Sequence, residues 1–298
     1  MLQTTIARTV SYTGVGLHSG KDVQMRLQPA PADSGIVFYV HTPSGVRHIA
    51  PRPSAVSATA LATTLSDGQA SVSTVEHVLA ALAGMAVDNV QVHVFGGEIP
   101  IMDGSAVQAA ALLKEAGLRS LHAPRRVARV RRPLSVAGDG KAIHVWPHNG
   151  FYVDYTIDFP HASIGKQRLS LEITPDTFAE IAFARTFGFL QEVEYLHSRG
   201  LALGAVVLDE QGVVNPEGLR RPDEFVRHKM LDFVGDMAML GMPLQGAFEV
   251  HCSGHQLNNA FLRRLSEERG AYLEIVSLTR ESAPAYEGEA FPAMVVPA

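Results

Sequence analysis

The amino-acid sequence predicts an α+β fold, in which each half of the chain begins with strands and continues with helices. Apolar and polar residues alternate in "VQMRLQ" (23–28) and "NVQVHVFG" (89–96), as they do in strands with one buried face. Apolar residues at helical spacing are less frequent, and they predict helices over 74–83, 105–116, 175–185, 223–240 and 256–268. This order of elements is typical of helices packed on mixed or antiparallel sheets.

The stretch "GLRSLHAPRRVARVRRP" (117–133) lies at the junction of the two halves and carries six arginines. We interpret it as running into an edge strand whose arginines face the solvent, with an anion-binding patch as the alternative. The predicted domains are therefore 1–123 and 124–270, followed by a C-terminal extension over 271–298. The end of this extension is rich in Pro and Ala, which predicts irregular structure.

Composition and charge exclude several classes of protein. The net charge of −5 argues against binding to nucleic acid, which requires Lys and Arg to neutralise phosphates. No apolar run approaches the ~20 residues that span a bilayer, and the N-terminal sequence lacks the apolar segment of a signal peptide. The single cysteine, Cys252, cannot form an internal disulfide, which fits a reducing compartment. Together these observations predict a cytoplasmic protein without a transmembrane segment.

The predicted helix in "STVEHVLAALAG" (73–84) is small or apolar on every face but begins with Glu76 and His77. A helix of this kind is usually buried all round. Ser73 as N-cap and Glu76 three residues later would form a capping box, which is the structural interpretation of the carboxylate. A cap does not explain His77, because a buried imidazole needs a polar partner.

A second helix is predicted within "RPDEFVRHKMLDFVGDMAMLGMP" (221–243). At 100° per residue, His228, Asp232 and Asp236 fall within about 80° of one another on its surface. One interpretation is a solvated polar face. The other is a metal site, because H-x-x-x-D places two ligand types one turn apart. With His77 added, three nitrogen and oxygen ligands leave a fourth position for water, as in catalytic zinc sites.

A third motif, "VHCSGHQLNNAFLRRL" (250–265), places His255 at the start of a predicted helix. A lone histidine at such a position is most often a cap or a surface residue, and a role in the site is the alternative. Cys252 has no C-x-x-C partner, so we leave it out of the site. In "ARTFGFL" (184–190), a threonine lies between an arginine and a Phe-Gly-Phe turn.

Five motifs resemble, in order and spacing, the zinc-dependent UDP-3-O-acyl-N-acetylglucosamine deacetylases of lipid A synthesis. They are "STVEHVLAALAG", "EIPIMDGSA", "ARTFGF", "EFVRHKMLDFVGD" and "SGHQLNN", and the similarity extends from "TVSYTGVGLHSG" to about residue 265. The resemblance implies two similar α+β domains whose helices are layered between β-sheets, each domain with a small insert. The second insert, near 187–214, would enclose an acyl chain, and the zinc site would lie between the domains.

The resemblance also implies roles for individual residues. One catalytic Zn²⁺ ion, or Fe²⁺ as a substitute, would be bound by His77, His228 and Asp232. The catalytic groups would be Glu76 as general base, His255 as general acid or oxyanion partner, Asp236 to orient His255, Thr186 to hold the oxyanion and Lys229 to contact the substrate. The substrate-binding residues would be Lys141 and Phe159 near the nucleotide, Leu17, Phe187 and Val193 along the acyl chain, and Phe189.

The sequence departs from the family pattern in three places. The segment "GLALGAVVLDE" (200–210) is about five residues shorter than usual, which leaves the preferred acyl length open. Cys252 stands where family members often carry a basic residue, so that one contact to the diphosphate is missing. Ala62 stands near the position of a frequent cysteine.

The implied reaction is zinc-dependent hydrolysis of the N-acetyl group of UDP-3-O-acyl-N-acetylglucosamine, which gives acetate and UDP-3-O-acyl-glucosamine. This is the committed step of lipid A biosynthesis. The expected partner is this small-molecule substrate rather than nucleic acid, and we expect a monomer. Two alternatives stay open at this point: a zinc amidohydrolase for another N-acetyl sugar or amide, and a sugar-nucleotide-binding protein with structural zinc, in which Glu76 is only a cap.

Overall fold

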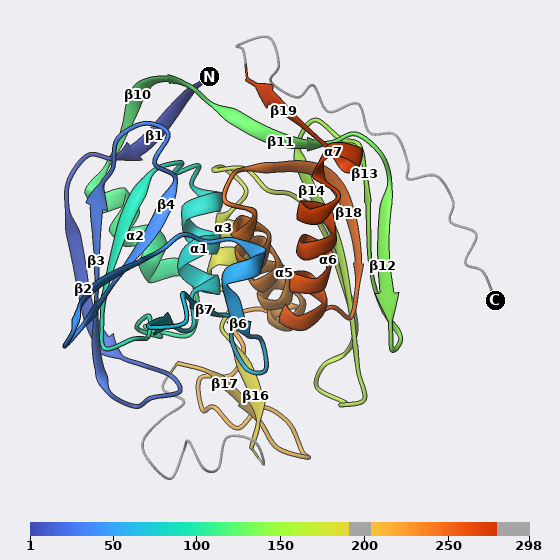
Figure 1. The fold of residues 1–298 in the computed structure, drawn as a ribbon. Coiled ribbons are helices and arrows are strands. Elements are labelled where there is room, and N and C mark those ends of the chain that lie inside the picture. The colour runs from blue at the N-terminus through green and yellow to red at the C-terminus, as the bar shows by residue number, and fades with distance from the viewer. Residues whose placement is uncertain (191–203, 279–298) are drawn as a thin grey trace.

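The computed structural model describes residues 1–190 and 204–278, which form two large sheets with a layer of helices between them (Figure 1). This arrangement confirms the predicted α+β class. The boundary between residues 123 and 124 and the internal likeness of the two halves stay predictions. Val193, part of the insert predicted near 187–214, and the sequence after residue 278 lie outside the described residues.

The first sheet is built from the N-terminal half of the chain, and its strand order is β2-β3-β9-β4-β5. Its strands are β2 (Val10–Val15), β3 (Asp22–Pro29), β4 (Ile36–Thr42), β5 (Gly45–Ile49) and β9 (Val90–Phe95). All neighbours are antiparallel except β4 and β9, which run parallel. In β9 the buried residues Val90, Val92 and Val94 alternate with more exposed ones, which is the predicted strand pattern with one face on the core.

The second sheet is built from the C-terminal half, and β18 is its central strand. Its strands are β11 (Arg126–Val130), β12 (Leu134–Gly138), β13 (Lys141–Trp146), β14 (Phe151–Phe159), β15 (Gly165–Glu172), β18 (Leu244–His251) and β19 (Leu273–Ser277). The prediction of an edge strand in the arginine-rich stretch is wrong, because β11 lies between β18 and β19. The strand that covers it, β19, comes from the predicted C-terminal extension and pairs with all five of its residues.

Three smaller sheets connect or extend these two. They are β1 (Leu2–Ile6) with β10 (Leu118–Pro124), β6 (Val56–Ala58) with β7 (Thr64–Ser66) and β8 (Ser71–Val72), and β16 (Phe187–Phe189) with β17 (Val206–Leu208). The pairing of β1 with β10 ties the start of the chain to the junction between the halves.

The helices fill the space between the large sheets. They are α1 (Glu76–Gly84), α2 (Val107–Ala116), α3 (Ala179–Ala182), α5 (Glu224–Met237), α6 (His255–Glu267) and α7 (Arg269–Tyr272), with 3₁₀ turns η1 (Pro53–Ala55) and η2 (Ala238–Leu240). The helix predicted over 175–185 is one short turn, because residues 175–178 form a turn and the residues after Ala184 run extended into β16. None of the described helices has the length and apolarity that a membrane crossing requires.

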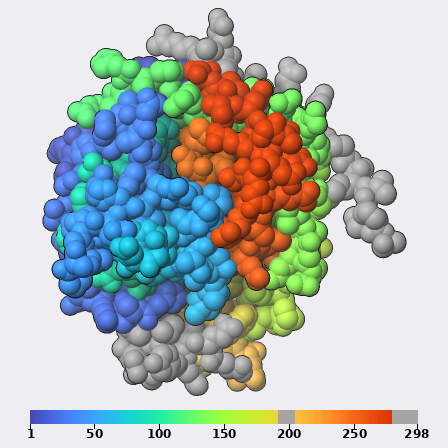
Figure 2. All heavy atoms as spheres, in the orientation of Figure 1, coloured from blue at the N-terminus to red at the C-terminus, as the bar shows by residue number. Residues whose placement is uncertain are grey.

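Helices α1 and α5 cross at backbone contact in the middle of the molecule. A Cβ atom at Gly235 of α5 would lie 2.0 Å from the carbonyl oxygen of Glu76, so only glycine allows this approach. Every residue of α1 except Ala83 is buried, as its composition predicts. Figure 2 shows a blue part of the N-terminal half beside a red and orange part of the C-terminal half on the surface of the molecule.

Candidate metal and catalytic site

The site begins at the first turn of α1, where Glu76 and His77 are the first two helical residues. The predicted capping box is wrong: the helix starts at Glu76 with Val75 at the N-cap position, and no side chain caps it. Ser73 cannot serve as the cap, because its backbone N–H and carbonyl pair with Gly97 and Ile99 in an extended segment. The Glu76 carboxylate is therefore free of a capping role and accepts a hydrogen bond from another loop.

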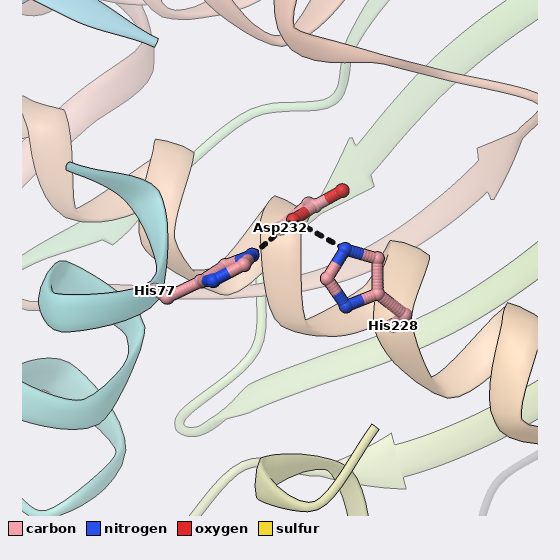
Figure 3. A group of neighbouring side chains, drawn as sticks. All are labelled: His77, His228 and Asp232. Atoms are coloured by element: carbon pink, nitrogen blue, oxygen red, sulfur yellow. Dashed lines mark ion pairs between the residues drawn. The ribbon is translucent and has the colours of Figure 1, made fainter. Parts of the chain in front are cut away.

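His77, His228 and Asp232 converge between the two crossing helices. Figure 3 shows the two imidazoles, one from α1 and one from α5, directed at the same Asp232 carboxylate. Nε2 of His77 lies 3.4 Å and Nε2 of His228 lies 3.2 Å from Asp232 Oδ1. All three side chains are buried, and their ligand atoms lie within 4.8 Å of one another. Helix crossing thus assembles the set that the sequence only suggested.

The state of His228 fits a metal ligand. Burial lowers the pKa of His228 to about 3, so the imidazole is neutral at pH 7. Its one hydrogen lies on Nδ1, because Nδ1 donates to the Ala184 carbonyl at 3.1 Å. Nε2 therefore directs a lone pair at a carboxylate oxygen, and two acceptors face each other at 3.2 Å. A cation bound between them would satisfy both atoms, so the residues present fit a metal ion.

The second oxygen of Asp232 is engaged by Lys229. Lys229 Nζ lies 2.7 Å from Asp232 Oδ2 and 5.5 Å from the centre of the Phe187 ring. Burial alone would raise the pKa of Asp232, but His228 and Lys229 hold that pKa well below its usual range. Asp232 is thus a carboxylate at any pH near neutrality, as a metal ligand must be.

One turn further along α5, Asp236 holds His255 at the start of α6. The Nδ1 hydrogen of His255 is donated to Asp236 Oδ2 at 2.7 Å. Asp236 also accepts hydrogen bonds from Asn258 Nδ2 at 2.7 Å and from Thr63 Oγ1 at 2.8 Å. Burial alone would lower the pKa of His255, but Asp236 raises it to about 10. His255 is therefore an imidazolium at neutral pH.

Glu76 is buried close to both His77 and His255. Its Oε2 accepts a hydrogen bond from the Thr63 backbone N–H at 3.1 Å. Burial raises the pKa of Glu76 above its ordinary value, and the positive charge of His255 partly offsets this. A carboxylate with a raised pKa is a stronger proton acceptor, which is the requirement for a general base near neutral pH.

These groups line a cavity of about 430 Å³. Of the residues predicted to act in the site, those on its wall are Glu76, His77, Asp232, His255, Thr186, Lys229, Leu17, Lys141 and Phe187. His228 and Asp236 stand behind them and are buried. The cavity therefore brings residues from both halves of the chain to one place.

Two predicted substrate residues lie beside this cavity rather than on its wall. Phe159 packs edge-to-face on Phe187, with ring centres 5.7 Å apart. Phe189 is 6.5 Å from Phe159 and lines a second cavity together with His161. Val193 lies outside the described residues, so its place along an acyl chain stays a prediction.

Two residues that support the site, Thr63 and Asn258, were not predicted from the sequence. Thr63 binds both Glu76 and Asp236, and nothing in its local sequence signals this, because its partners are distant along the chain. Asn258 had a weak signal, since it follows His255 by three residues and so shares its helix face.

An α+β fold that places this donor set beside a buried carboxylate and an imidazolium is that of a metal-dependent hydrolase. The family model of UDP-3-O-acyl N-acetylglycosamine deacetylase matches residues 3–267. The chain belongs to this family. Membership confirms the expected hydrolase of amide bonds, and the family's reaction is the deacetylation step of lipid A biosynthesis.

Similar proteins carry one name, UDP-3-O-acyl-N-acetylglucosamine deacetylase. The protein of Nitratidesulfovibrio vulgaris is 60% identical over 283 residues, which cover 93% of this chain and 92% of the relative. That of Oleidesulfovibrio alaskensis is 55% identical over 299 residues, and the match covers 98% of each chain. That of Pseudomonas entomophila is 43% identical over 290 residues, or 95% of this chain and 96% of the relative.

Proposed function

We propose that the chain binds one zinc ion and hydrolyses the N-acetyl group of UDP-3-O-acyl-N-acetylglucosamine, giving acetate and UDP-3-O-acyl-glucosamine. His77, His228 and Asp232 would hold the ion. The observation that carries the proposal is the convergence of these three buried groups, two of which, His77 and Asp232, line the same cavity as Glu76 and His255. Nitrogen and oxygen donors suit Zn²⁺ and also accept Fe²⁺, which would be a functional substitute.

The bound ion supplies Lewis acidity, which polarises the acetamide carbonyl and lowers the pKa of a water molecule toward ~7. Glu76 provides the base: its carboxylate, fixed by the Thr63 N–H, accepts the proton of the attacking water. Because Glu76 and His77 are consecutive residues in one rigid turn, the base keeps a fixed distance from the ligand beside it.

His255 would place a positive charge beside the reacting amide. Its Nδ1 is held by Asp236, so its Nε2–H is the group available to the developing oxyanion and to the leaving amine. The Thr186 hydroxyl on the cavity wall would donate a second hydrogen bond to the oxyanion. The leaving amine takes its proton either from His255 or from Glu76 acting a second time.

Substrate recognition would use the two ends of the same cavity. Lys141 offers a cation for the diphosphate of the nucleotide, and Lys229 offers one for the polar part of the sugar. Leu17 and Phe187 give apolar walls for the acyl chain, and Phe159 and Phe189 extend that aromatic surface.

Release of free amine from UDP-3-O-acyl-N-acetylglucosamine tests the proposal. We expect turnover by the native chain, loss of turnover with a chelator and recovery when zinc is returned. The same compound without its 3-O-acyl chain should be a poor substrate. Turnover that survives chelation would rule out the metal mechanism, and equal turnover without the acyl chain would rule out the proposed substrate.

Glu76→Ala separates catalysis from binding. We expect zinc content to stay at the native level while hydrolysis falls by about 10²- to 10⁴-fold, because only the proton acceptor is removed. Zinc content would be measured by atomic emission and hydrolysis by amine release. Glu115→Ala, at an exposed position of α2, is the control. Unchanged hydrolysis in the Glu76 variant would contradict the base assignment.

We also propose that the protein acts in the cytoplasm as a monomer. A single cysteine fits a reducing compartment. The ligands, the base and the imidazolium all come from one chain, so the site needs no second copy. Light scattering after size exclusion at micromolar concentration should give the mass of one chain.

A further inference from the structure

The segment from Ala184 to Phe187 serves the site at both of its ends. The Ala184 carbonyl accepts the Nδ1 hydrogen of His228, and the Thr186 side chain lies on the cavity wall. The backbone of Thr186 is fixed on both sides, because its N–H donates to Gly104 at 2.7 Å and its carbonyl accepts from Val206 at 2.7 Å. Arg185 lies between these two groups and has no place in the proposed reaction.

Arg185 is buried, and its main partner is the fully buried Glu224. Its Nε donates to Glu224 Oε1 at 2.9 Å, and its Nη2 donates to Glu224 Oε2 at 3.2 Å. The backbone N–H of Arg185 donates to the same carboxylate at 3.0 Å. Glu224 is the first residue of α5, the helix that carries His228 one turn later. One carboxylate thus ties both the backbone and the side chain of Arg185 to that helix.

A second arginine closes the network on the other side of Glu224. The backbone N–H of Arg220 donates to Glu224 Oε2 at 2.6 Å, and its Nη2 donates to Asp103 Oδ2 at 2.9 Å. Asp103 precedes Gly104, whose carbonyl holds the Thr186 N–H. Glu224 of α5 is therefore connected to the backbone of Thr186 by two routes. One runs directly through Arg185, and the other runs through Arg220, Asp103 and Gly104.

We propose that Arg185 and Glu224 are a positioning pair, which fixes the Thr186 hydroxyl and the Ala184 carbonyl that orients His228. The inference rests on the function proposed above, because it gives Thr186 and His228 their roles. A buried ion pair adds little net stability, since desolvation offsets its attraction. Two parallel hydrogen bonds do fix the orientation of the groups that they join. An oxyanion donor and a metal ligand both depend on a fixed orientation.

Glu224→Gln and Arg185→Lys test the pair, because each keeps the size of the side chain but removes the charge or the fork. We expect kcat to fall by about 10-fold in both, with KM within about twofold of native. The zinc affinity of the apoprotein, measured by competition with a chromophoric chelator, should also fall by about 10-fold. Glu268→Gln breaks a similar pair with Arg264, which is half exposed and 3.2 Å long, and should leave all three values unchanged.

A purely structural role would lower the midpoint of urea unfolding but leave kcat per folded molecule and zinc affinity at native values, and that result would overturn the proposal. If Glu224→Gln does not fold, Arg185→Lys decides alone by the same two values. The zinc measurement needs no substrate, so it stands even if the native chain fails to release amine. If the native chain shows chelator-sensitive turnover but both variants keep native kcat and zinc affinity, only the positioning pair is overturned and the proposed function stands.

Discussion

Two aspartates one turn apart on α5 face histidines and give them opposite states. Asp232 lies beside His228, whose pKa burial lowers to about 3, so that imidazole is a neutral donor of electrons. Asp236 holds His255, whose pKa it raises to about 10, so that imidazole carries a proton. An aspartate of α5 beside a histidine thus accompanies a neutral imidazole in one place, as the proposed metal ligand requires, and an imidazolium in the other, as the proposed acid requires.

The other partners of each carboxylate account for the difference. Asp232 favours a proton on His228, but the burial of His228 and the positive charge of Lys229, which lies 2.7 Å from Asp232, oppose it. Asp236 receives its other hydrogen bonds from Thr63 and Asn258, which are neutral. Among the groups hydrogen-bonded to Asp236 in the described residues, His255 is the one that carries a positive charge. The state of each histidine follows from the charges around its aspartate and from whether its ring hydrogen is donated to that aspartate, as in His255, or to a backbone carbonyl, as in His228.

The largest effect should come from removing the charge of Asp232. In Asp232→Asn we expect loss of bound zinc and a fall in hydrolysis of roughly 10³-fold or more, because the ion contributes several kcal/mol to the transition state. Metal analysis and amine release measure the two effects. Zinc retained at the native level would mean that Asp232 is not a ligand.

Asp236→Asn should change the protonation of His255 and leave the proposed metal ligands His228 and Asp232 unchanged. We expect zinc content to stay native while kcat falls by about 10²-fold. In the native chain the protonated form of His255 is lost as pH rises through about 10. Without the carboxylate, burial dominates and lowers the pKa of His255, so the alkaline limb of the kcat/KM profile should move to lower pH. A limb that does not move would show that another group titrates there.

Asn258→Ala should have the smallest effect of the three. It removes a neutral partner of Asp236 and leaves the charge in place, so kcat should fall by no more than about tenfold. The alkaline limb should stay or move to higher pH, opposite to the Asp236 variant, because a carboxylate with fewer donors attracts the proton of His255 more strongly. Urea unfolding should show a loss of about 1–3 kcal/mol, since Ser253 also loses its partner. A limb at lower pH would contradict the comparison.

The sequence predicts what lies within one element and misses what depends on a distant partner. Helical spacing alone put His228, Asp232 and Asp236 on one face of α5, and the structure places all three at the site. The helix predicted over 175–185 is too long at both ends, and at its C-terminal end the chain leaves the helix toward Thr186, whose backbone pairs with Gly104, some eighty positions away in the chain. The cap at Ser73 failed for the same reason, because Gly97 and Ile99 occupy its backbone groups.

The contact at Gly235 has a consequence for the proposed metal ligands. His77 is carried by α1, and the other two proposed ligands are carried by α5, so the distance between the helices fixes the size of the donor triangle. A side chain at position 235 would meet the Glu76 carbonyl and push the helices apart. A residue that is not among the proposed ligands thus helps to set the spacing between them, because it fixes how closely the two helices that carry them approach.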